Sequence, residues 1–404
     1  MEKTAPSPAA EARIARVAPV IRGLLARPSG NDDVPYKRVI LEFLSGKEIP
    51  PAPAVGERGA AQLPPLPLAS LDYEAAPERL REQIASAISD FAQRHGAKPQ
   101  VIVLPGVGAL CAVEDAAEPD LPLRNETAIV TGAAGAIGSG ICRGLLKNGC
   151  RVAATDLPGE RLERFVAEFA RTAGHRPFDG TQGGPEQRRT GRIIGVPLDV
   201  TSEKSVADAF NAVARRWGGV DIVIANAGIP LISSLVEMSL EDFRRLEQVN
   251  VEGTLLTLAE AGRHMRLQGT GGDIVLISTK NVFSPGARFG GYSATKAGAH
   301  QLARIASLEM APFGVRVNMV APDAVFADGE RKSGLWEKIG PDRMRDKGID
   351  EKGLQDYYRQ RNLLKVQVTA EHVANAVLFF VTRQTPTTGA TIPVDGGLPD
   401  ATPR

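Results

Sequence analysis

The sequence predicts an α/β protein, with a doubly wound parallel sheet of about seven strands that follows a small α+β appendage. Two observations lead to this prediction. From Glu126 onward, short apolar runs alternate with longer segments of helical periodicity, which is the pattern of βαβ units. Before that point, prolines cluster from Pro50 to Pro67 and the periodic segments are short. No internal repeat of fixed period is present, which argues against solenoids and propellers.

The N-terminal part is predicted to consist of a disordered leader, residues 1–12, and the appendage with its proline-rich linkers, residues 13–124. Hydrophobic periodicity predicts helices over 13–26 and 76–93 and strands over 37–43 and 101–104. The turn at 105–108 has two interpretations. A phosphate-binding turn is one, and a plain turn that ends the strand is the favoured one. We assign this turn no chemistry.

Residues 125–397 are predicted to form the doubly wound domain, followed by a tail at 398–404. The predicted strands are Thr127–Thr131, Arg151–Thr155, Ile193–Pro197, Asp221–Ala225, Asp273–Ser278, Arg316–Val320 and Ala390–Val394. Helices between them are expected on both faces of the sheet, and residues 170–192 are expected to form a surface loop. The long charged segment 326–366 is interpreted as a lid over the substrate, with a subunit-contact arm as the alternative.

The composition is that of an ordinary soluble protein. Hydrophobic residues make up 43% of the 404 residues and charged residues 24%, and the net charge of +1 offers no basic excess to nucleic acid or anionic membranes. No run approaches the roughly twenty apolar residues of a membrane span. The three cysteines lack metal-ligand spacing and suit buried thiols in a reducing cytoplasm. We therefore expect a cytoplasmic protein without nucleic-acid or membrane partners.

A glycine-rich turn follows the first predicted strand and precedes a helix. Small residues in such a turn let a pyrophosphate approach the backbone, and the helix N-terminus supplies unpaired N–H groups. The predicted contacts are Gly132, Gly135, Ala136, Ile137 and Gly138.

Asp156 ends the second predicted strand, where a carboxylate can accept hydrogen bonds from the adenosine ribose hydroxyls and repel a 2′-phosphate. The sequence thus favours NAD over NADP, with helix capping by Asp156 as the alternative. Asp199–Val200 and Asn226–Ala227–Gly228 end the third and fourth strands, so they are expected at the same crevice.

Tyr292 and Lys296 are four residues apart, so on a helix they share one face. A neighbouring ammonium lowers a phenol's pKa from its usual value of about 10, towards the range of a base that works near neutrality. The pair therefore predicts a proton-transfer device. Because this spacing also arises by chance on amphipathic helices, its weight comes from the glycine turn upstream.

In this order and spacing, Thr131–Gly132, Gly138, Asp199, Asn226–Ala227–Gly228, Asn250, Tyr292 and Lys296 resemble the short-chain dehydrogenase/reductase family, from about Thr127 to Gly397. The resemblance implies a Rossmann sheet, with Asp199 near the adenine and the turn at 226–228 supporting the cofactor ribose. It further implies that Tyr292 is the general base in oxidation and that Lys296 contacts the nicotinamide ribose. Asn250 would distort a helix and hold a water in the proton relay, with a packing role as the alternative.

The family places a serine thirteen positions before the tyrosine, where this sequence has Thr279. The threonine hydroxyl can make the same hydrogen bonds as a serine hydroxyl, so Thr279 would hold the substrate oxygen. Ser278 is the alternative, because only one of two neighbouring strand side chains can face the crevice. Ala136 replaces a usual glycine. Asp323 also replaces a glycine, between Pro322 and Val325, which are predicted to contact the cofactor. Lys280, Asn281 and Asp323 are candidate substrate contacts, with an internal Lys280–Asp323 ion pair as the alternative.

A closer resemblance connects Lys280–Asn281, 322–326, 358–362 and 388–397 with the dehydrogenase half of bifunctional rhamnulose-1-phosphate aldolase/alcohol dehydrogenase proteins. A class II aldolase needs a histidine cluster for its metal, and the five histidines here show no paired ligand spacing, so we expect neither metal nor aldolase activity. The resemblance implies a small, lactaldehyde-like hydroxyl or carbonyl substrate. It also implies a homodimer or homotetramer, through helices that begin near Leu240 and Gly291. A non-catalytic NAD-binding regulator or scaffold is the alternative function.

Overall fold

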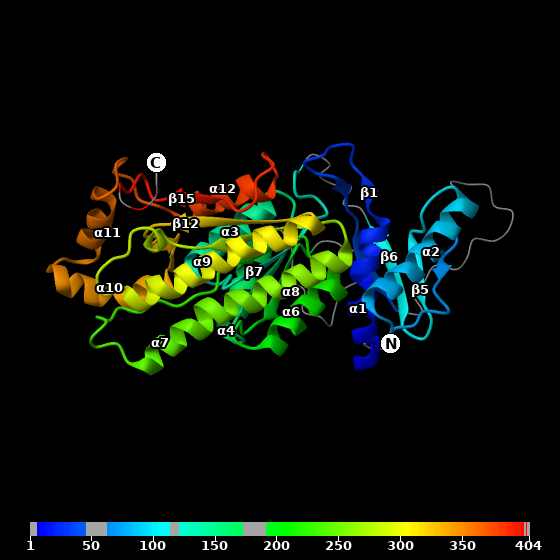
Figure 1. Cartoon of the computed structure of the whole chain (residues 1–404), viewed down its shortest axis with the longest axis horizontal. Coiled ribbons are helices and arrows are strands. Elements are labelled where there is room, and N and C mark those ends of the chain that lie inside the picture. The colour runs from blue at the N-terminus through cyan, green and yellow to red at the C-terminus, as the bar shows by residue number, and fades with distance from the viewer. Residues whose placement is uncertain (1–5, 46–62, 114–120, 173–190, 400, 402–404) are drawn as a thin grey trace.

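The computed structural model describes residues 6–45, 63–113, 121–172, 191–399 and 401. Its centre is a seven-stranded parallel sheet with the order β15-β12-β11-β10-β7-β8-β9 (Figure 1). The strands are β7 (Thr127–Thr131), β8 (Arg151–Asp156), β9 (Ile193–Pro197), β10 (Ile222–Ala225), β11 (Gly272–Ile277), β12 (Val315–Pro322) and β15 (Thr391–Val394). The predicted α/β fold with a seven-stranded parallel sheet is confirmed, and the predicted strand bounds agree to within two residues.

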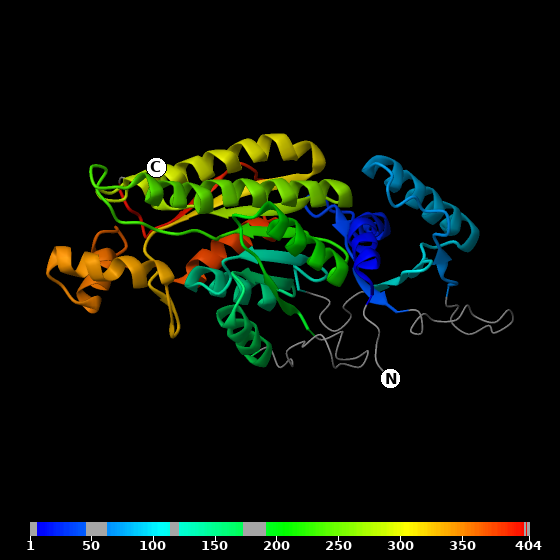
Figure 2. The ribbon, with the colours of Figure 1, turned by 90° about the horizontal axis from the view of Figure 1, so that it is seen from below.

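Helices cover both faces of this sheet, as Figure 2 shows from below. One layer consists of α3 (Ala136–Lys147), α4 (Glu160–Thr172) and α12 (Ala370–Val381), and the other of α6 (Glu203–Trp217), α8 (Gly253–Gln268) and α9 (Gly290–Met310). Successive side chains of β7 alternate between the layers, since Val130 belongs to the first core and Ile129 to the second. This two-sided burial explains why the strands are apolar throughout.

The strand order reverses between β7 and β10. From β7 the chain continues to β8 and β9 on one side, whereas β10, β11, β12 and β15 extend the sheet on the other. Helices therefore diverge at this point, and a crevice opens outside the carboxyl ends of the two central strands. Residues at the ends of β7 and β10 are thus placed to contact one ligand.

The appendage contains more regular structure than the sequence predicted. It comprises α1 (Pro8–Leu25), β1 (Arg27–Pro28), β2 (Tyr36–Lys37), β3 (Ile40–Leu44), β4 (Leu66–Pro67), α2 (Pro77–His95), β5 (Val101–Leu104) and β6 (Gly108–Val113), with a four-stranded sheet in the order β3-β6-β5-β4. Residues 8–12, expected in a disordered leader, are helical because Ser7 caps α1 and a proline follows it. Residues 1–5, the linker at 46–62 and residues 173–190 of the predicted surface loop lie outside the described residues. The loop was predicted over 170–192, but residues 170–172 are helical because α4 extends to Thr172.

The turn at 105–108 joins two antiparallel strands, because β6 pairs with β5. Val107 N–H donates to the Leu104 carbonyl at 2.9 Å, and Gly106 has a φ of +73°. The turn is thus a hairpin turn, and the favoured interpretation of the sequence, a plain turn, is the one that the geometry supports.

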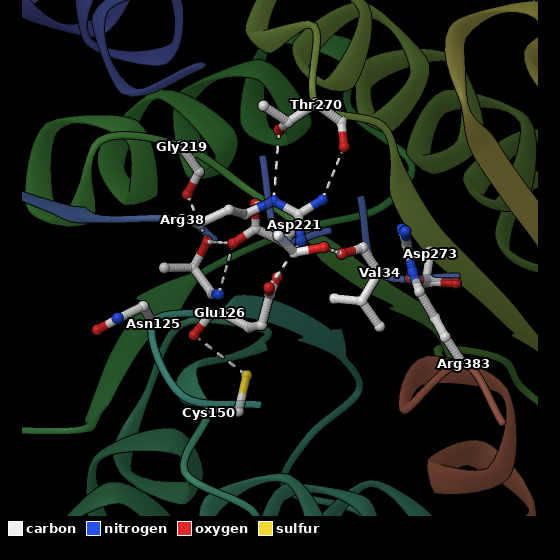
Figure 3. Close-up of polar contacts among 12 residues, drawn as sticks. Val34, Arg38, Asn125, Glu126, Cys150, Gly219, Asp221, Thr270, Asp273 and Arg383 are labelled. Atoms are coloured by element: carbon white, nitrogen blue, oxygen red, sulfur yellow. Dashed lines mark hydrogen bonds and ion pairs between the residues drawn. The ribbon is translucent and has the colours of Figure 1, made fainter. Parts of the chain in front are cut away.

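A buried charge network joins the appendage to the amino-terminal edge of the large sheet. Arg22 of α1, only 1% exposed, donates to both carboxylate oxygens of Asp221 at 2.8 and 2.7 Å. Arg38 donates to Glu126 at 2.6 Å and to the Thr270 carbonyl at 2.8 Å (Figure 3). Burial acts to raise the pKa of Asp221, but Arg22 and Arg38 outweigh it and hold that pKa below its usual range. The appendage is therefore fixed at the edge opposite the crevice.

The predicted lid segment contains β13 (Ala327–Asp328), β14 (Arg331–Lys332), α10 (Gly334–Lys347) and α11 (Glu351–Gln360). Figure 1 shows α10 and α11 in orange at the end of the molecule that lies away from the appendage. Trp336 and Tyr358 of these helices pack around Phe326, with the Phe326 and Trp336 rings stacked at 4.4 Å. In the part of the chain that the structure describes, no helix has the length and apolar character needed to cross a membrane.

Candidate active site

The glycine turn between β7 and α3 is closely packed. Gly132 has a φ of +62°, and a Cβ atom added to it would lie 3.1 Å from the Ala227 Cα. A Cβ on Gly138 would lie 2.4 Å from the Gly132 carbonyl oxygen. Ala136, in contrast, is the first residue of α3, where a methyl group fits ordinary helix geometry. The turn thus directs the unpaired N–H groups at the start of α3 into the crevice.

Asp156 lies at the carboxyl end of β8 beside this turn. Its carboxylate accepts hydrogen bonds from Ala134 N–H at 3.0 Å and Leu157 N–H at 2.9 Å. These contacts fix the carboxylate and leave further lone pairs for hydroxyl donors. Arg161 also lines this part of the crevice and donates to the Ala134 carbonyl at 3.2 Å. The sequence did not single out Arg161, since an arginine in the first turn of a helix carries no motif.

The ends of β7 and β10 are tied together by hydrogen bonds. The Asn226 amide donates to the carbonyls of Thr131 and Gly132 at 2.8 and 3.1 Å, and the Thr131 hydroxyl accepts from Ala227 N–H at 2.9 Å. Asp199 is held in a similar way, since its carboxylate accepts from the Thr201 hydroxyl at 2.7 Å. This rim of the crevice is therefore preorganised.

Tyr292 and Lys296 project from α9 into the crevice and are 9% and 4% exposed. The Tyr292 side chain is hydrogen-bonded to Thr279, and the Lys296 ammonium donates to the Ile277 carbonyl at 2.7 Å. Ser278 contacts a different partner, because its hydroxyl lies 2.9 Å from Nδ1 of His300. Of the two candidate hydroxyls, Thr279 is thus the one beside the tyrosine.

The expected lowering of the tyrosine pKa is absent, which corrects the sequence prediction. Burial raises the pKa of Tyr292 to about 12, although the hydrogen bond from Thr279 acts in the opposite direction. Burial also lowers the pKa of Lys296 to about 8. Both effects have the same cause: removal from water disfavours the charged form of each group. The spacing of the pair did not reveal this, because it contains no information on burial.

Asn250 lies behind the crevice in a π-helical turn, Gln248–Glu252, between α7 (Leu240–Glu247) and α8. Its amide donates to the Ile229 carbonyl at 3.0 Å and to the Thr295 hydroxyl at 3.1 Å, while its carbonyl accepts from Ile229 N–H at 2.9 Å. Such turns are frequent at functional sites. The helix distortion expected at this asparagine is therefore present, and the side chain holds the loop that follows β10.

On the substrate side, Asp323 pairs with Arg361 rather than with Lys280. The Arg361 Nε lies 3.3 Å from one Asp323 oxygen, and its Nη2 donates to the other. Lys280 instead donates to the Ser284 carbonyl at 3.0 Å. The alternative of an internal Lys280–Asp323 ion pair is thus wrong. Asp323 pairs instead with Arg361, which lies 38 residues further along the chain.

One cavity of about 760 Å³ brings these parts together. Its lining includes the predicted cofactor residues, Thr279, Tyr292, Lys296 and all three candidate substrate residues, but not Asn250. Helices α10 and α11 close its far end with Trp336, Arg343 and Tyr358. The sequence pointed to this segment as a lid but did not single out Arg343. The volume suits a dinucleotide together with a small substrate.

Metal-binding groups are not gathered at this site. Among the described residues, no three His, Cys, Asp or Glu side chains are close enough to hold a metal ion together. Cys142 and Cys150 are buried free thiols, and burial raises their pKa above the usual value. Such thiols are poor nucleophiles and poor metal ligands.

Comparison with known proteins gives a consistent result. Residues 126–338 match the family model described as short chain dehydrogenase. The chain is 34% identical over 289 residues to the uncharacterized oxidoreductase YuxG of Bacillus subtilis. This alignment covers 71% of this chain but only 39% of YuxG. It is 31% identical over 281 residues to the mitochondrial (-)-isopiperitenol/(-)-carveol dehydrogenase of Mentha piperita, covering 68% of this chain and 94% of the relative.

Among solved structures, sorbitol-6-phosphate 2-dehydrogenase SrlD from Erwinia amylovora superposes with a TM-score of 0.58 at 27% identity. The superposition covers 67% of this chain and 98% of that structure.

Proposed function

The chain belongs to the short-chain dehydrogenase/reductase family, and from this premise we propose that it is an NAD-dependent oxidoreductase acting on CH–OH groups. It would transfer hydride between nicotinamide and a small hydroxylated alcohol or its carbonyl form. Two of the similar proteins are named as dehydrogenases, of carveol and of sorbitol 6-phosphate, which supports this reaction class. The non-catalytic NAD-binding scaffold is the alternative.

The observation that carries the proposal is the buried trio of Tyr292, Thr279 and Lys296 beside the crevice. NAD, when bound, supplies the hydride acceptor. In oxidation, Tyr292 would first release its own proton to solvent. As phenolate it would then take the proton of the substrate hydroxyl, while Thr279 holds the same oxygen by a hydrogen bond. Lys296 would position the nicotinamide ribose from its anchor on Ile277. Asn250 would keep the loop after β10 in place through its bonds to Ile229.

The choice of NAD rests on Asp156. A fixed carboxylate at the end of β8 suits the two ribose hydroxyls and opposes a 2′-phosphate by charge repulsion. Arg161, which lines the crevice nearby, is the residue that would favour NADP instead. Comparison of the two cofactors in wild type and in Asp156→Ala decides between them. We expect NAD to be preferred by the wild type and the preference to weaken in the variant.

For the substrate, we propose a small hydroxyl or carbonyl compound of lactaldehyde-like size, as in the dehydrogenase half of rhamnulose-1-phosphate aldolase/alcohol dehydrogenase proteins. The short motifs around Lys280 and Asp323 support this subgroup. We propose no aldolase activity for this chain. The buried free thiols fit a reducing compartment such as the cytoplasm.

The proposal is tested by measuring NAD reduction with a panel of small alcohols, hydroxyaldehydes and polyols. Wild type should reduce NAD with at least one of them. Tyr292→Phe should bind NAD normally and lose about 10²-fold or more in turnover, because it lacks the proton acceptor. NAD binding without turnover of any compound would instead favour the scaffold.

A further inference from the structure

Three of the cationic side chains that line the cavity come from different elements around its substrate end: Lys280, which follows Thr279, Arg343 of α10 and Arg361 just after α11. We call them the cationic wall. The carboxylates that line the cavity are Asp156, Asp199 and Asp323. The first two accept backbone N–H groups near the glycine turn and β9, and only Asp323 faces the cationic wall. The three cations of the wall are thus balanced by the carboxylate of Asp323 alone among the carboxylates that line the cavity.

Arg343 is the most informative member of the cationic wall. Its guanidinium lies over the Phe289 ring at 4.6 Å, and that ring lies 6.2 Å from the ring of Tyr292. Its Nε is buried without a hydrogen-bond partner among the described residues. The side chain as a whole is half-buried and lines the cavity, and among the described residues no carboxylate pairs with its guanidinium. A guanidinium placed in this way beside Tyr292 is suited to an anionic acceptor on a ligand.

The other two members are each held in place by a contact within the chain. Asp323 pairs with Arg361, whose guanidinium also stacks on Tyr358 at 4.1 Å. Lys280 is anchored by a neutral carbonyl, that of Ser284, at 3.0 Å. Burial, together with the charges of Arg361 and Arg343, lowers the pKa of Lys280, whereas Asp323 acts to raise it. The mutual repulsion of these cations would be relieved by a bound anion.

We propose that the cationic wall binds an anionic group of the substrate, a phosphate or a carboxylate, while Tyr292 and Thr279 act on its hydroxyl. This inference rests on the proposed function and narrows its substrate class. The cofactor's own pyrophosphate has a separate place at the glycine turn and the start of α3. Neutral alcohols would then be poorer substrates than their anionic counterparts, and increasing salt would weaken substrate binding.

The kinetic test uses two matched pairs of compounds. Sorbitol and sorbitol 6-phosphate form the phosphate arm, and 2-butanol and 3-hydroxybutyrate form the carboxylate arm. In one arm, the wild-type kcat/KM should be at least about tenfold higher for the anionic member than for the neutral one. In Arg343→Gln, the kcat/KM for the anionic member should fall by at least about tenfold, because a charge-assisted hydrogen bond is lost. The fall in kcat/KM should be larger for the anionic member than for the neutral one. The pair of compounds that shows both effects identifies the anionic group as phosphate or carboxylate.

The matched control is Arg345→Gln, which removes the same charge from the same helix. Arg345 is 75% exposed and pairs with Asp342, so its removal should leave both members of each pair unaffected. Lys280→Gln provides a second test if Arg343→Gln does not fold, as judged by circular dichroism. Equal rates for neutral and anionic members in both arms, unchanged in the variants, would overturn the inference.

A binding measurement separates this inference from the proposed function. Inorganic phosphate and malonate are titrated calorimetrically into protein saturated with NADH, so that the pyrophosphate site is already filled. Binding of either anion by wild type, weakened at least about tenfold in Arg343→Gln but not in Arg345→Gln, supports the cationic wall even if no alcohol is oxidised. No binding, or equal binding in all three proteins, contradicts it.

Discussion

At the scale of single residues, the proposed chemistry depends on burial. Tyr292 and Lys296 share a helix face, as their spacing predicted, but each is removed from water and each is driven towards its neutral form. Thr279 is distinguished from Ser278 by its partner, since His300 takes the serine hydroxyl. Non-local neighbours therefore decide the state of these groups.

The phenol of Tyr292 should remain protonated well above neutrality in the protein without nucleotide. Because burial raises its pKa to about 12, phenolate should form only in strong alkali. Difference absorbance titration of wild type against Tyr292→Phe checks this, since the phenol that the variant lacks should titrate above the ordinary value of about 10. Titration of that phenol below the ordinary value would show that Lys296 outweighs burial.

The glycine turn allows a matched pair of substitutions. Gly138→Ala places a methyl group 2.4 Å from a backbone oxygen, whereas in Gly135→Ala the nearest atom is 3.4 Å away and φ is −77°. We expect Gly138→Ala to lower the free energy of unfolding by about 1–3 kcal/mol through overpacking. Gly135→Ala should change it by no more than about 0.5–1 kcal/mol. Urea denaturation measures both, and equal effects would contradict the packing argument.

At the scale of elements, the sequence predicted what depends on local pattern. The seven strands and the helices between them follow from hydrophobic periodicity, and Thr127–Thr131 and Ile193–Pro197 have the predicted bounds. The early start of α1 was missed although its Ser7–Pro8 signal is local. Strand β6 was missed because its burial arises from pairing with β3 and β5. The Asp323–Arg361 pair and the position of Arg343 in the cavity wall depend on how the lid segment packs against the sheet domain. The spacing of residues along the sequence does not predict that packing.

The junction between α1 and the large sheet should contribute strongly to stability. Replacing Arg22 by Met leaves Asp221 buried without its bidentate partner, and breaking such a pair costs about 3–5 kcal/mol. Arg79→Met, on the exposed face of α2, is the control and should change the free energy of unfolding by less than about 0.5 kcal/mol. Urea denaturation compares the two. Similar stability of both variants would mean that the network does not anchor the appendage.

At the scale of the whole molecule, the appendage and the lid occupy opposite ends, with the crevice at the lid end (Figure 1). Between them, α8 and α9 pack against each other and leave apolar side chains exposed. These are Leu255, Ile305, Leu308 and, just after α9, Phe313, with exposed fractions of 49%, 41%, 76% and 41%. We propose that a second copy of the chain covers this face, in a homodimer or homotetramer.

A charge introduced on this face should dissociate the oligomer. Leu308→Glu places a carboxylate where a second copy would bury it without a partner, so sedimentation should shift to a smaller species. Lys204→Glu changes an exposed side chain of α6, 86% exposed, and should leave the oligomer intact. Monomeric wild type, or an unchanged assembly in Leu308→Glu, would exclude this face as the interface.

Direct hydride transfer assisted by Tyr292 can be followed with alcohols that carry deuterium on the carbinol carbon. Wild type should transfer this deuterium to the nicotinamide ring of NAD, where mass spectrometry detects it, whereas Tyr292→Phe should bind NAD but transfer almost none. Loss of the label to water would exclude direct transfer, and equal transfer by the variant would exclude the role of Tyr292.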